Sequence, residues 1–187
     1  MKPNKNNTPK LSSYCAFLRG VNVGGVNMKM AEACKVFEKE GLNNVSSILA
    51  SGNILFSSNL TPKTVENKLK KALSQHFNYD AHLFILDAES IQNLVKNNPF
   101  SPHPDFHIYS FVGIEHIAEI LMKEFKGLKT ELEEEAKMIH DTFYWRVPKS
   151  HTLLSQFGKI LGRKDLRDSF TSRNMNTFER VLKKLYP

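Results

Sequence analysis

The stretch that decides the fold is Tyr14-Cys-Ala-Phe-Leu18, an apolar run of strand length, together with the glycine-rich turn Arg19-Gly-Val-Asn-Val-Gly-Gly-Val-Asn27 that follows it. From Met30 to Phe37 the apolar side chains recur at helical spacing, and Gly41 stands where a helix is expected to end. The chain is therefore predicted to open with a strand, a glycine-rich turn and a helix.

Five further elements follow in a regular order. Residues 45–50 and 54–57 are typical of strands joined by a tight turn at Ser51-Gly-Asn53. Thr61 and Pro62 have the residue types that open a helix, residues 81–86 are predicted to form a strand, and Asp87 is predicted to cap a short helix. The order strand, helix, strand, strand, helix, strand predicts an α+β fold of the ferredoxin-like βαββαβ type with an antiparallel sheet. Its central strands are the first and third, which brings Arg19 and Asn53 to one edge of the sheet.

A stiff connector divides this half from the rest of the chain. Asn98-Pro-Phe-Ser-Pro-His-Pro104 holds three prolines in seven residues and is the best candidate for a domain boundary. Beyond it we expect strands at 106–112 and 143–147, a helix through 117–125, and two helices at the end of the chain. Residues 131–135 are expected to form a solvated helix face, 140–141 a helix end, and Asn176 with Glu179 a capping box for the last helix. The predicted organisation is a disordered basic tail over 1–13, a ferredoxin-like α+β domain over 14–100 and a smaller second α+β domain over 101–187.

The distribution of charge narrows the possible partners. The formal net charge of the 187 residues is +7. Residues 1–13 carry +3 from Lys2, Lys5 and Lys10, and residues 163–187 carry +4, so the body between them is neutral. No apolar run approaches the ~20 residues of a membrane span, and the N-terminus has no secretory signal, so we expect a cytoplasmic protein without a membrane partner. The charge favours a local anion site over a basic surface.

Metal and cofactor signals are weak. Cys15 and Cys34 are flanked by apolar residues, which favours two reduced buried thiols. His103, Asp105 and His107 would share a strand face, but Pro102 and Pro104 interrupt that strand and no fourth ligand is evident, so we predict no metal site. The glycine spacing of residues 20–25 matches neither the dinucleotide-binding nor the phosphate-loop pattern, and no cofactor is predicted.

Three polar segments are candidates for an anion site: the turn after the first strand, Ser51-Gly-Asn53 and Thr171–Thr177. The turn after the first strand offers backbone amides near a helix start, although its glycines are equally explained by a turn that needs positive φ angles. Helix capping explains part of Thr171-Ser-Arg-Asn-Met-Asn-Thr177 but does not explain Arg173. An arginine beside the N-terminus of a helix is electrostatically unfavourable unless an acidic side chain or an anionic ligand lies next to it. The predicted ligand-binding residues are Arg19, Gly20, Asn22, Gly24, Gly25, Ser51, Asn53, Arg173, Asn174 and Asn176.

These segments resemble the domain-of-unknown-function 1697 family. The similarity is carried by the turn beginning at Arg19, by Ser51-Gly-Asn53, by Asn98-Pro-Phe100 and by Thr171-x-Arg-Asn-x-Asn-Thr177, in order and spacing over residues 14–187. It implies a compact α+β protein of bacterial type and no assigned activity. Two positions depart from the family pattern, Met175 where the family has tryptophan and His151 where it has lysine.

Three hypotheses of function follow from the sequence. The first is a binding module for a small phosphate-bearing or nucleotide-like ligand in a cleft between the two halves. The second is binding of RNA or single-stranded DNA, which is motivated by the +4 of residues 163–187, the basic tail and the ability of four-stranded sheets to stack bases. The aromatic run Phe143-Tyr-Trp145 could also stack a base, although alternation in a strand places such rings more often in the core. The third is an enzyme acting on a phosphorylated small molecule, for which the motifs supply no proton-transferring group and hence no predicted catalytic residue. Nothing in the sequence indicates the oligomeric state.

Overall fold

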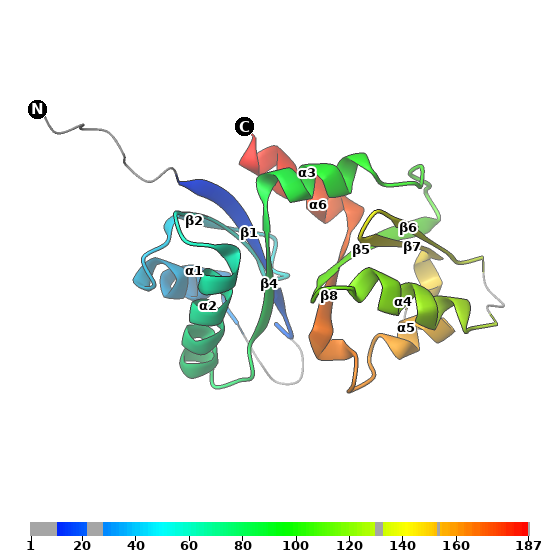
Figure 1. The fold of residues 1–187 in the computed structure, drawn as a ribbon, viewed down its shortest axis with the longest axis horizontal. Helices are drawn as coiled ribbons and strands as arrows, with labels where there is room; N and C mark the ends of the chain where they lie inside the picture. The colour runs from blue at the N-terminus through cyan, green and yellow to red at the C-terminus, as the bar shows by residue number, and fades with distance from the viewer. Residues whose placement is uncertain (1–10, 22–27, 130–132, 153, 187) are drawn as a thin grey trace, which may run out of the picture.

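The computed structural model describes residues 11–21, 28–129, 133–152 and 154–186, and within them the chain forms two four-stranded antiparallel sheets and six α-helices (Figure 1). The first sheet has the strand order β2-β3-β1-β4. The elements of this half are β1 (Ser12–Arg19), α1 (Met30–Lys39), β2 (Asn43–Ile48), β3 (Asn53–Ser58), α2 (Pro62–Phe77) and β4 (His82–Asp87). Both the α+β class and the predicted order of these elements are confirmed.

The second sheet has the order β6-β7-β5-β8. It is joined to the first half by α3 (Ala88–Lys96) and the proline-rich connector. Its elements are β5 (Phe106–Gly113), α4 (Ile117–Lys126), β6 (Glu135–Ile139), β7 (Thr142–Pro148), α5 (Gln156–Ile160), β8 (Phe170–Asn174) and α6 (Met175–Leu185). The strands at both edges of this sheet, β6 and β8, come from segments that the sequence did not identify as strands.

Three apolar cores hold these layers together. The first core lies between the first sheet and helices α1 and α2, and the third lies between the second sheet and helices α4 and α5. The central core takes side chains from both sheets and from α3 and α6, which lie side by side between them (Figure 1). Phe17 of β1 packs against Phe178 of α6 there, with the two rings tilted by 50° and their centroids 5.2 Å apart. Residues from both ends of the chain therefore share one core.

Local sequence signals explain where the helices of the first half begin. The Thr61 hydroxyl accepts a hydrogen bond from the backbone N–H of Thr64, and Pro62 occupies the first helical position. The Asp87 carboxylate accepts one from the N–H of Ser90 at 2.7 Å and so caps α3. Gly41 follows α1 with a φ angle of 79°, the left-handed conformation expected just after a helix. These three predictions are confirmed.

Three predictions for the second half are wrong. Of the segment 131–135, expected to carry a helix face, residues 131–132 lie outside the described residues, Glu133 and Glu134 are not helical, and Glu135 begins β6, where it pairs with Lys137 at 3.0 Å. His140 and Asp141 form the turn to β7. The polar residues 171–174 belong to strand β8. Helix α6 begins at Met175, and its cap is Asn174, which accepts from the N–H of Asn176; the capping box of Asn176 and Glu179 does not form.

The boundary of the predicted tail also shifts. Residues 1–10 lie outside the described residues, but Ser12 and Ser13 belong to β1 and pair with Ser58 and Ser57 of β3. The strand therefore starts before residue 14, because two small polar residues continue the ladder ahead of the apolar run. Of the helices in the described ranges, none combines the length and the apolar composition of a membrane span.

Candidate functional site

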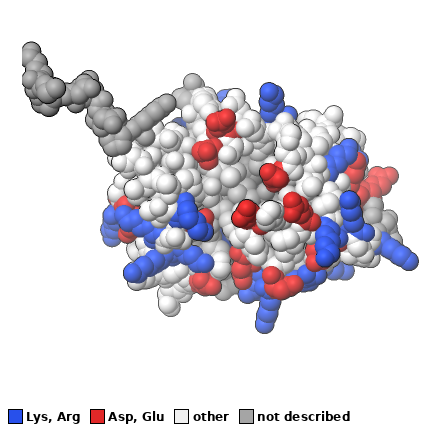
Figure 2. Space-filling model, in the orientation of Figure 1, with Lys and Arg blue, Asp and Glu red and all other residues white. Residues whose placement is uncertain are grey.

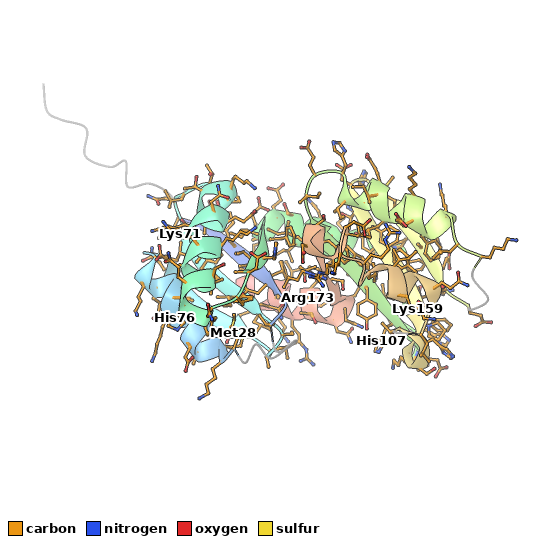
Figure 3. The ribbon with its side chains drawn as sticks, turned by 90° about the horizontal axis from the view of Figure 1, so that it is seen from below. Met28, Lys71, His76, His107, Lys159 and Arg173 are labelled. Carbon is orange, nitrogen blue, oxygen red and sulfur yellow. The ribbon has the colours of Figure 1, made fainter. Side chains whose placement is uncertain are left out.

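Arg173 lies between the two sheets (Figure 3) and binds groups from both. It stands on β8, opposite Ser110 of β5, with its guanidinium carbon 5.9 Å from the ring centroid of Phe17. A guanidinium carries five N–H donors in a fixed plane. The acceptors of Arg173 are Asn53 Oδ1 (2.6 Å), Thr171 Oγ1 (2.7 Å) and the carbonyl oxygens of Leu18 (2.7 Å), Ser172 (2.8 Å), Ser51 (2.9 Å) and Gly52 (3.4 Å).

These acceptors are all uncharged, and this determines the electrostatics of the site. No carboxylate among the described residues forms an ion pair with Arg173. Burial lowers the pKa of its guanidinium to about 10, with a further lowering from Arg19. Burial also raises the pKa of the neighbouring Cys15 thiol well above its ordinary value, so that thiol is uncharged at neutral pH and supplies no counter-charge. Arg173 is therefore a buried cation held by neutral dipoles.

Two residues of the β2–β3 turn make this arrangement possible. Asn53 is fully buried, and its Nδ2 donates to the carbonyl of Ile48 and to Ser51 Oγ, both at 3.0 Å, which leaves Oδ1 to face Arg173. Gly52 has a φ angle of 74°, and a Cβ atom there would lie 3.0 Å from side-chain atoms of Leu18 and Val21. The turn therefore requires glycine, because only a residue without a side chain lets it approach β1 so closely.

Arg19 extends from the end of β1 towards the second sheet. Alternation along β1 places it on the same face as Cys15 and Phe17, which belong to the central core. Its Nη1 donates to the carbonyl of Phe170 at 3.0 Å, and its guanidinium carbon lies 5.2 Å from the centroid of that ring. Its Nε is 3.8 Å from a carboxylate oxygen of Asp168, and its pKa is lowered by burial against the opposing effect of that carboxylate. Among the described residues, its Nη2 group has no hydrogen-bond acceptor.

The two arginines line one hollow of about 380 Å³, which we call the cationic hollow. It is formed by residues 18–21, Ser51 and residues 171–173. Neither an acidic side chain nor a histidine is among these lining residues, so the described part of the hollow offers positive charge and hydroxyl groups. Such a site is suited to hold an anion and contains no group that transfers protons near neutral pH.

The predicted site residues divide into three groups. Arg19, Gly20, Ser51 and Arg173 meet in the cationic hollow, with Asn53 buried behind Arg173. Asn174 and Asn176 lie in a different pocket of about 400 Å³. Successive residues of β8 point to opposite faces of the sheet, which separates Asn174 from Arg173, and Asn176 belongs to α6. Asn22, Gly24 and Gly25 lie outside the described residues.

The second pocket is built around His107 of β5. Asn174 Oδ1 accepts from the N–H of Asn176 at 3.0 Å, so its Nδ2 amide faces His107 and donates to Nδ1 at 3.1 Å. Because Nδ1 accepts this bond, the neutral ring carries its proton on Nε2. Burial lowers the pKa of His107, and Lys149 lowers it further. Asn174 thus has a structural role, as helix cap and as partner of His107.

The aromatic run of β7 is core. Phe143 and Tyr144 are completely buried and Trp145 is 1% exposed, so these rings present no face to a nucleobase. On the face of the molecule shown in Figure 2, basic and acidic side chains are interspersed. The suggestion that this aromatic run stacks on bases is therefore wrong. The described residues also contain no cluster of three or more potential metal ligands.

Sequence reasoning missed several residues of the site. Thr171 and Ser172 line the cationic hollow, and the carbonyl of Leu18 holds Arg173, yet the segment 171–174 was interpreted as a helix cap. The strand signal in this segment is limited to Phe170 and the β-branched Thr171.

Comparison with known proteins agrees with this α+β architecture. Residues 11–144 match the model of a family described as "Protein of unknown function (DUF1697)", a range that includes three of the four motifs and ends before residues 171–177. No curated protein matches the chain. Among solved structures, the chain is similar to the conserved bacterial protein SP0830 from Streptococcus pneumoniae, with a TM-score of 0.78 and 21% identity over 95% of this chain and 100% of that one. At this identity the likeness concerns the fold alone. The family match spans well over half of the chain, and the protein is accordingly a member of the DUF1697 family of unknown function.

Proposed function

We propose that the protein binds a small phosphate-bearing ligand in the cationic hollow, with Arg19 as the main contact to the phosphate group. The observation that carries this proposal is the state of Arg173, a buried cation whose acceptors are all neutral. Its charge is solvated by dipoles but not cancelled, so it contributes a positive potential to the hollow that Arg19 lines.

The two arginines have separate roles in this proposal. The guanidinium of Arg173 already makes hydrogen bonds along both its Nη groups and its Nε, so it acts on a ligand through its charge. Arg19 and the hydroxyl group of Ser51 supply the hydrogen bonds. Ser51 Oγ accepts from Asn53, and its own proton is therefore available to an anion.

The nearest carboxylate does not neutralise the hollow. Asp168 is 3.8 Å from Arg19 Nε and 3.5 Å from Arg167 Nε, so one acid is shared between two arginines. The absence of an acidic side chain or a histidine from the described lining favours binding over catalysis. A dianion such as phosphate, which accepts several hydrogen bonds and prefers arginine, fits this composition.

Isothermal titration calorimetry with pyrophosphate tests the proposal. The unsubstituted protein is expected to bind it, and Arg19→Met is expected to weaken binding by at least about tenfold, the loss of one charge-assisted hydrogen bond. Arg167→Met is the matched control, because it removes the same charge beside Asp168 from a residue that does not line the hollow. No heat of binding with the unsubstituted protein, or equal losses in the two variants, contradicts the proposal.

A further inference from the structure

The pocket around His107 is a second candidate site, separate from the cationic hollow. We call it the His107 pocket. Its volume of about 400 Å³ lies within the roughly 300–1,000 Å³ typical of sites for small molecules. Among the described residues, none lines both this pocket and the cationic hollow. The lining of the His107 pocket therefore defines a ligand of its own.

The strand order of the second sheet places opposite charges on the two sides of His107. Strand β5, which carries His107, lies between β7 and β8. Lys149 directly follows β7, and its backbone N–H donates to the carbonyl of Asp105, beside the start of β5, at 2.9 Å. On the other side, β8 leads into α6, whose second turn carries Glu179. The pocket thus receives an ammonium group from one flank of β5 and a carboxylate from the other.

Some polar side chains of the lining are committed to the protein itself. Asn98 Nδ2 donates to the carbonyl of Phe100 at 3.1 Å, and Asn98 Oδ1 accepts from the N–H of the same residue at 3.2 Å. His103 Nδ1 accepts from the N–H of Asp105 at 3.2 Å, and its ring packs edge-on against Phe106 with centroids 5.1 Å apart. These side chains build the walls of the pocket and are not needed to contact a ligand.

Four other polar groups of the lining remain available to a ligand. In the described part of the chain, Lys149 and Glu179 form no ion pair, either with each other or with a third residue. The side-chain amide of Asn176 also has no hydrogen-bond partner there. His107 Nδ1 is occupied by the amide of Asn174, so the neutral ring offers the donor Nε2–H. The pocket therefore presents one cation, one anion and neutral hydrogen-bonding groups.

The remaining lining of the pocket is apolar. It consists of Pro102, Pro104, Phe106, Ile108 and Met175, of which the last two are buried. Contact with such a surface favours apolar atoms of a ligand. The ligand that fits the whole lining therefore carries an ammonium group, a carboxylate and a hydrocarbon side chain.

We infer that the His107 pocket binds an α-amino acid with an apolar side chain. Its carboxylate contacts Lys149 and the Nε2–H of His107, and its ammonium group contacts Glu179. A ligand with a single charge would leave one charged side chain of the pocket unpaired and partly removed from water, which is unfavourable. This inference goes beyond the proposed function and does not depend on it.

Three probes that differ by one charged group test the inference. L-Leucine carries both charged groups, L-leucinamide lacks the carboxylate, and 4-methylpentanoate lacks the ammonium group. The full-length protein is titrated with each probe by calorimetry at about pH 7, where both charged groups of L-leucine are ionised. We expect L-leucine to bind at least about tenfold more tightly than either analogue, which corresponds to the loss of one charge-assisted hydrogen bond.

Two variants assign the charged groups of the probe to the two sides of the pocket. Glu179→Gln is expected to weaken L-leucine binding about tenfold and to leave the affinity for 4-methylpentanoate unchanged, because that probe has no ammonium group. Lys149→Met is expected to weaken L-leucine binding similarly and to leave the affinity for L-leucinamide unchanged. Glu38→Gln and Lys164→Met, at exposed positions outside the pocket, are the matched controls and are expected to bind all three probes as the unsubstituted protein does.

Several results would overturn the inference. Absence of L-leucine binding does so directly. Equal affinities for the three probes would show that the pocket recognises only the hydrocarbon chain, and weaker binding of only one analogue would show that it recognises a single charge. A loss of L-leucine affinity in the control variants as large as in Glu179→Gln and Lys149→Met would place the binding elsewhere. None of these results bears on pyrophosphate binding in the cationic hollow, so the two proposals fail separately.

Discussion

Arg173 and Arg19 reach the same hollow from different sheets, and their surroundings differ. Arg173 is enclosed by acceptors from β1, the β2–β3 turn and β8, and its hydrogen bonds join the two halves of the chain. Within the described ranges Arg19 makes one hydrogen bond, to Phe170, and shares Asp168 with Arg167. The difference shows that a buried arginine can hold two sheets together through its hydrogen bonds and contribute a positive electrostatic potential. The less enclosed arginine beside it remains available to a ligand.

The largest expected effect is on stability, from Arg173→Met. This change leaves buried acceptors such as Asn53 Oδ1 and the Leu18 carbonyl without donors, and we expect the free energy of unfolding to fall by about 3 kcal/mol in urea denaturation. Arg180→Met, on the exposed face of α6, is the control and is expected to change it by less than about 0.5 kcal/mol. If both substitutions change the free energy of unfolding by similarly small amounts, the hydrogen bonds of Arg173 do not hold the two sheets together.

Asn53→Asp places a negative charge beside Arg173 and leaves Arg173 itself unchanged. A carboxylate at 2.6 Å from Nε would neutralise the buried guanidinium, and we expect the affinity for pyrophosphate to fall about tenfold in calorimetry. Asn53→Ala removes the same hydrogen bond without adding a negative charge, and it is expected to retain more of the affinity. If the aspartate variant binds at least as tightly as the alanine variant, the uncancelled charge of Arg173 is not what attracts the anion.

A smaller effect is expected from His107, outside the cationic hollow. Its pKa in the folded protein lies below the ordinary value of 6.5, so the unfolded chain takes up the proton first as the pH falls. The folded state therefore loses stability as the pH decreases below about 6.5, where protonation also ends the hydrogen bond from Asn174 to Nδ1.

The measurement is the free energy of unfolding between pH 7.5 and pH 5.5, chosen as roughly one unit on either side of that value. We expect His107→Gln to show a shallower decline than the unsubstituted protein, while His76→Gln, a substitution in α2 outside this pocket, keeps the original slope. Parallel declines in the unsubstituted protein and the His107 variant would contradict the assigned protonation state.

The first sheet could be predicted from sequence because its strands are apolar runs and its helices begin with hydroxyl, proline or aspartate signals, as at Thr61 and Asp87. The strands that were missed, β6 and β8, are the two edges of the second sheet. Edge strands have fewer buried side chains, so Glu135-Ala-Lys137 and Thr171-Ser-Arg173 have the composition of surface segments.

The candidate site was predictable only in part, for a related reason. The approach of Arg19 to the β2–β3 turn follows from the antiparallel register of one sheet, in which Phe17 pairs with Asn53. Four of the six acceptors of Arg173 come from segments more than a hundred residues away in the chain, and no local sequence pattern predicts such contacts. The sequence predicts an anion beside Arg173, whereas in the fold neutral oxygen atoms accept the hydrogen bonds of its guanidinium.

The proposal that Arg173 stabilises the fold while Arg19 binds the ligand is tested most directly by the midpoint temperature of thermal unfolding of Arg19→Met, measured with and without pyrophosphate. Without the ligand, the midpoint is expected to lie within about 3 °C of that of the unsubstituted protein, because Arg19 contributes little to the folded state. With the ligand, the unsubstituted protein is expected to gain stability and the variant to gain none. A ligand-dependent increase in the variant equal to that of the unsubstituted protein would contradict the account.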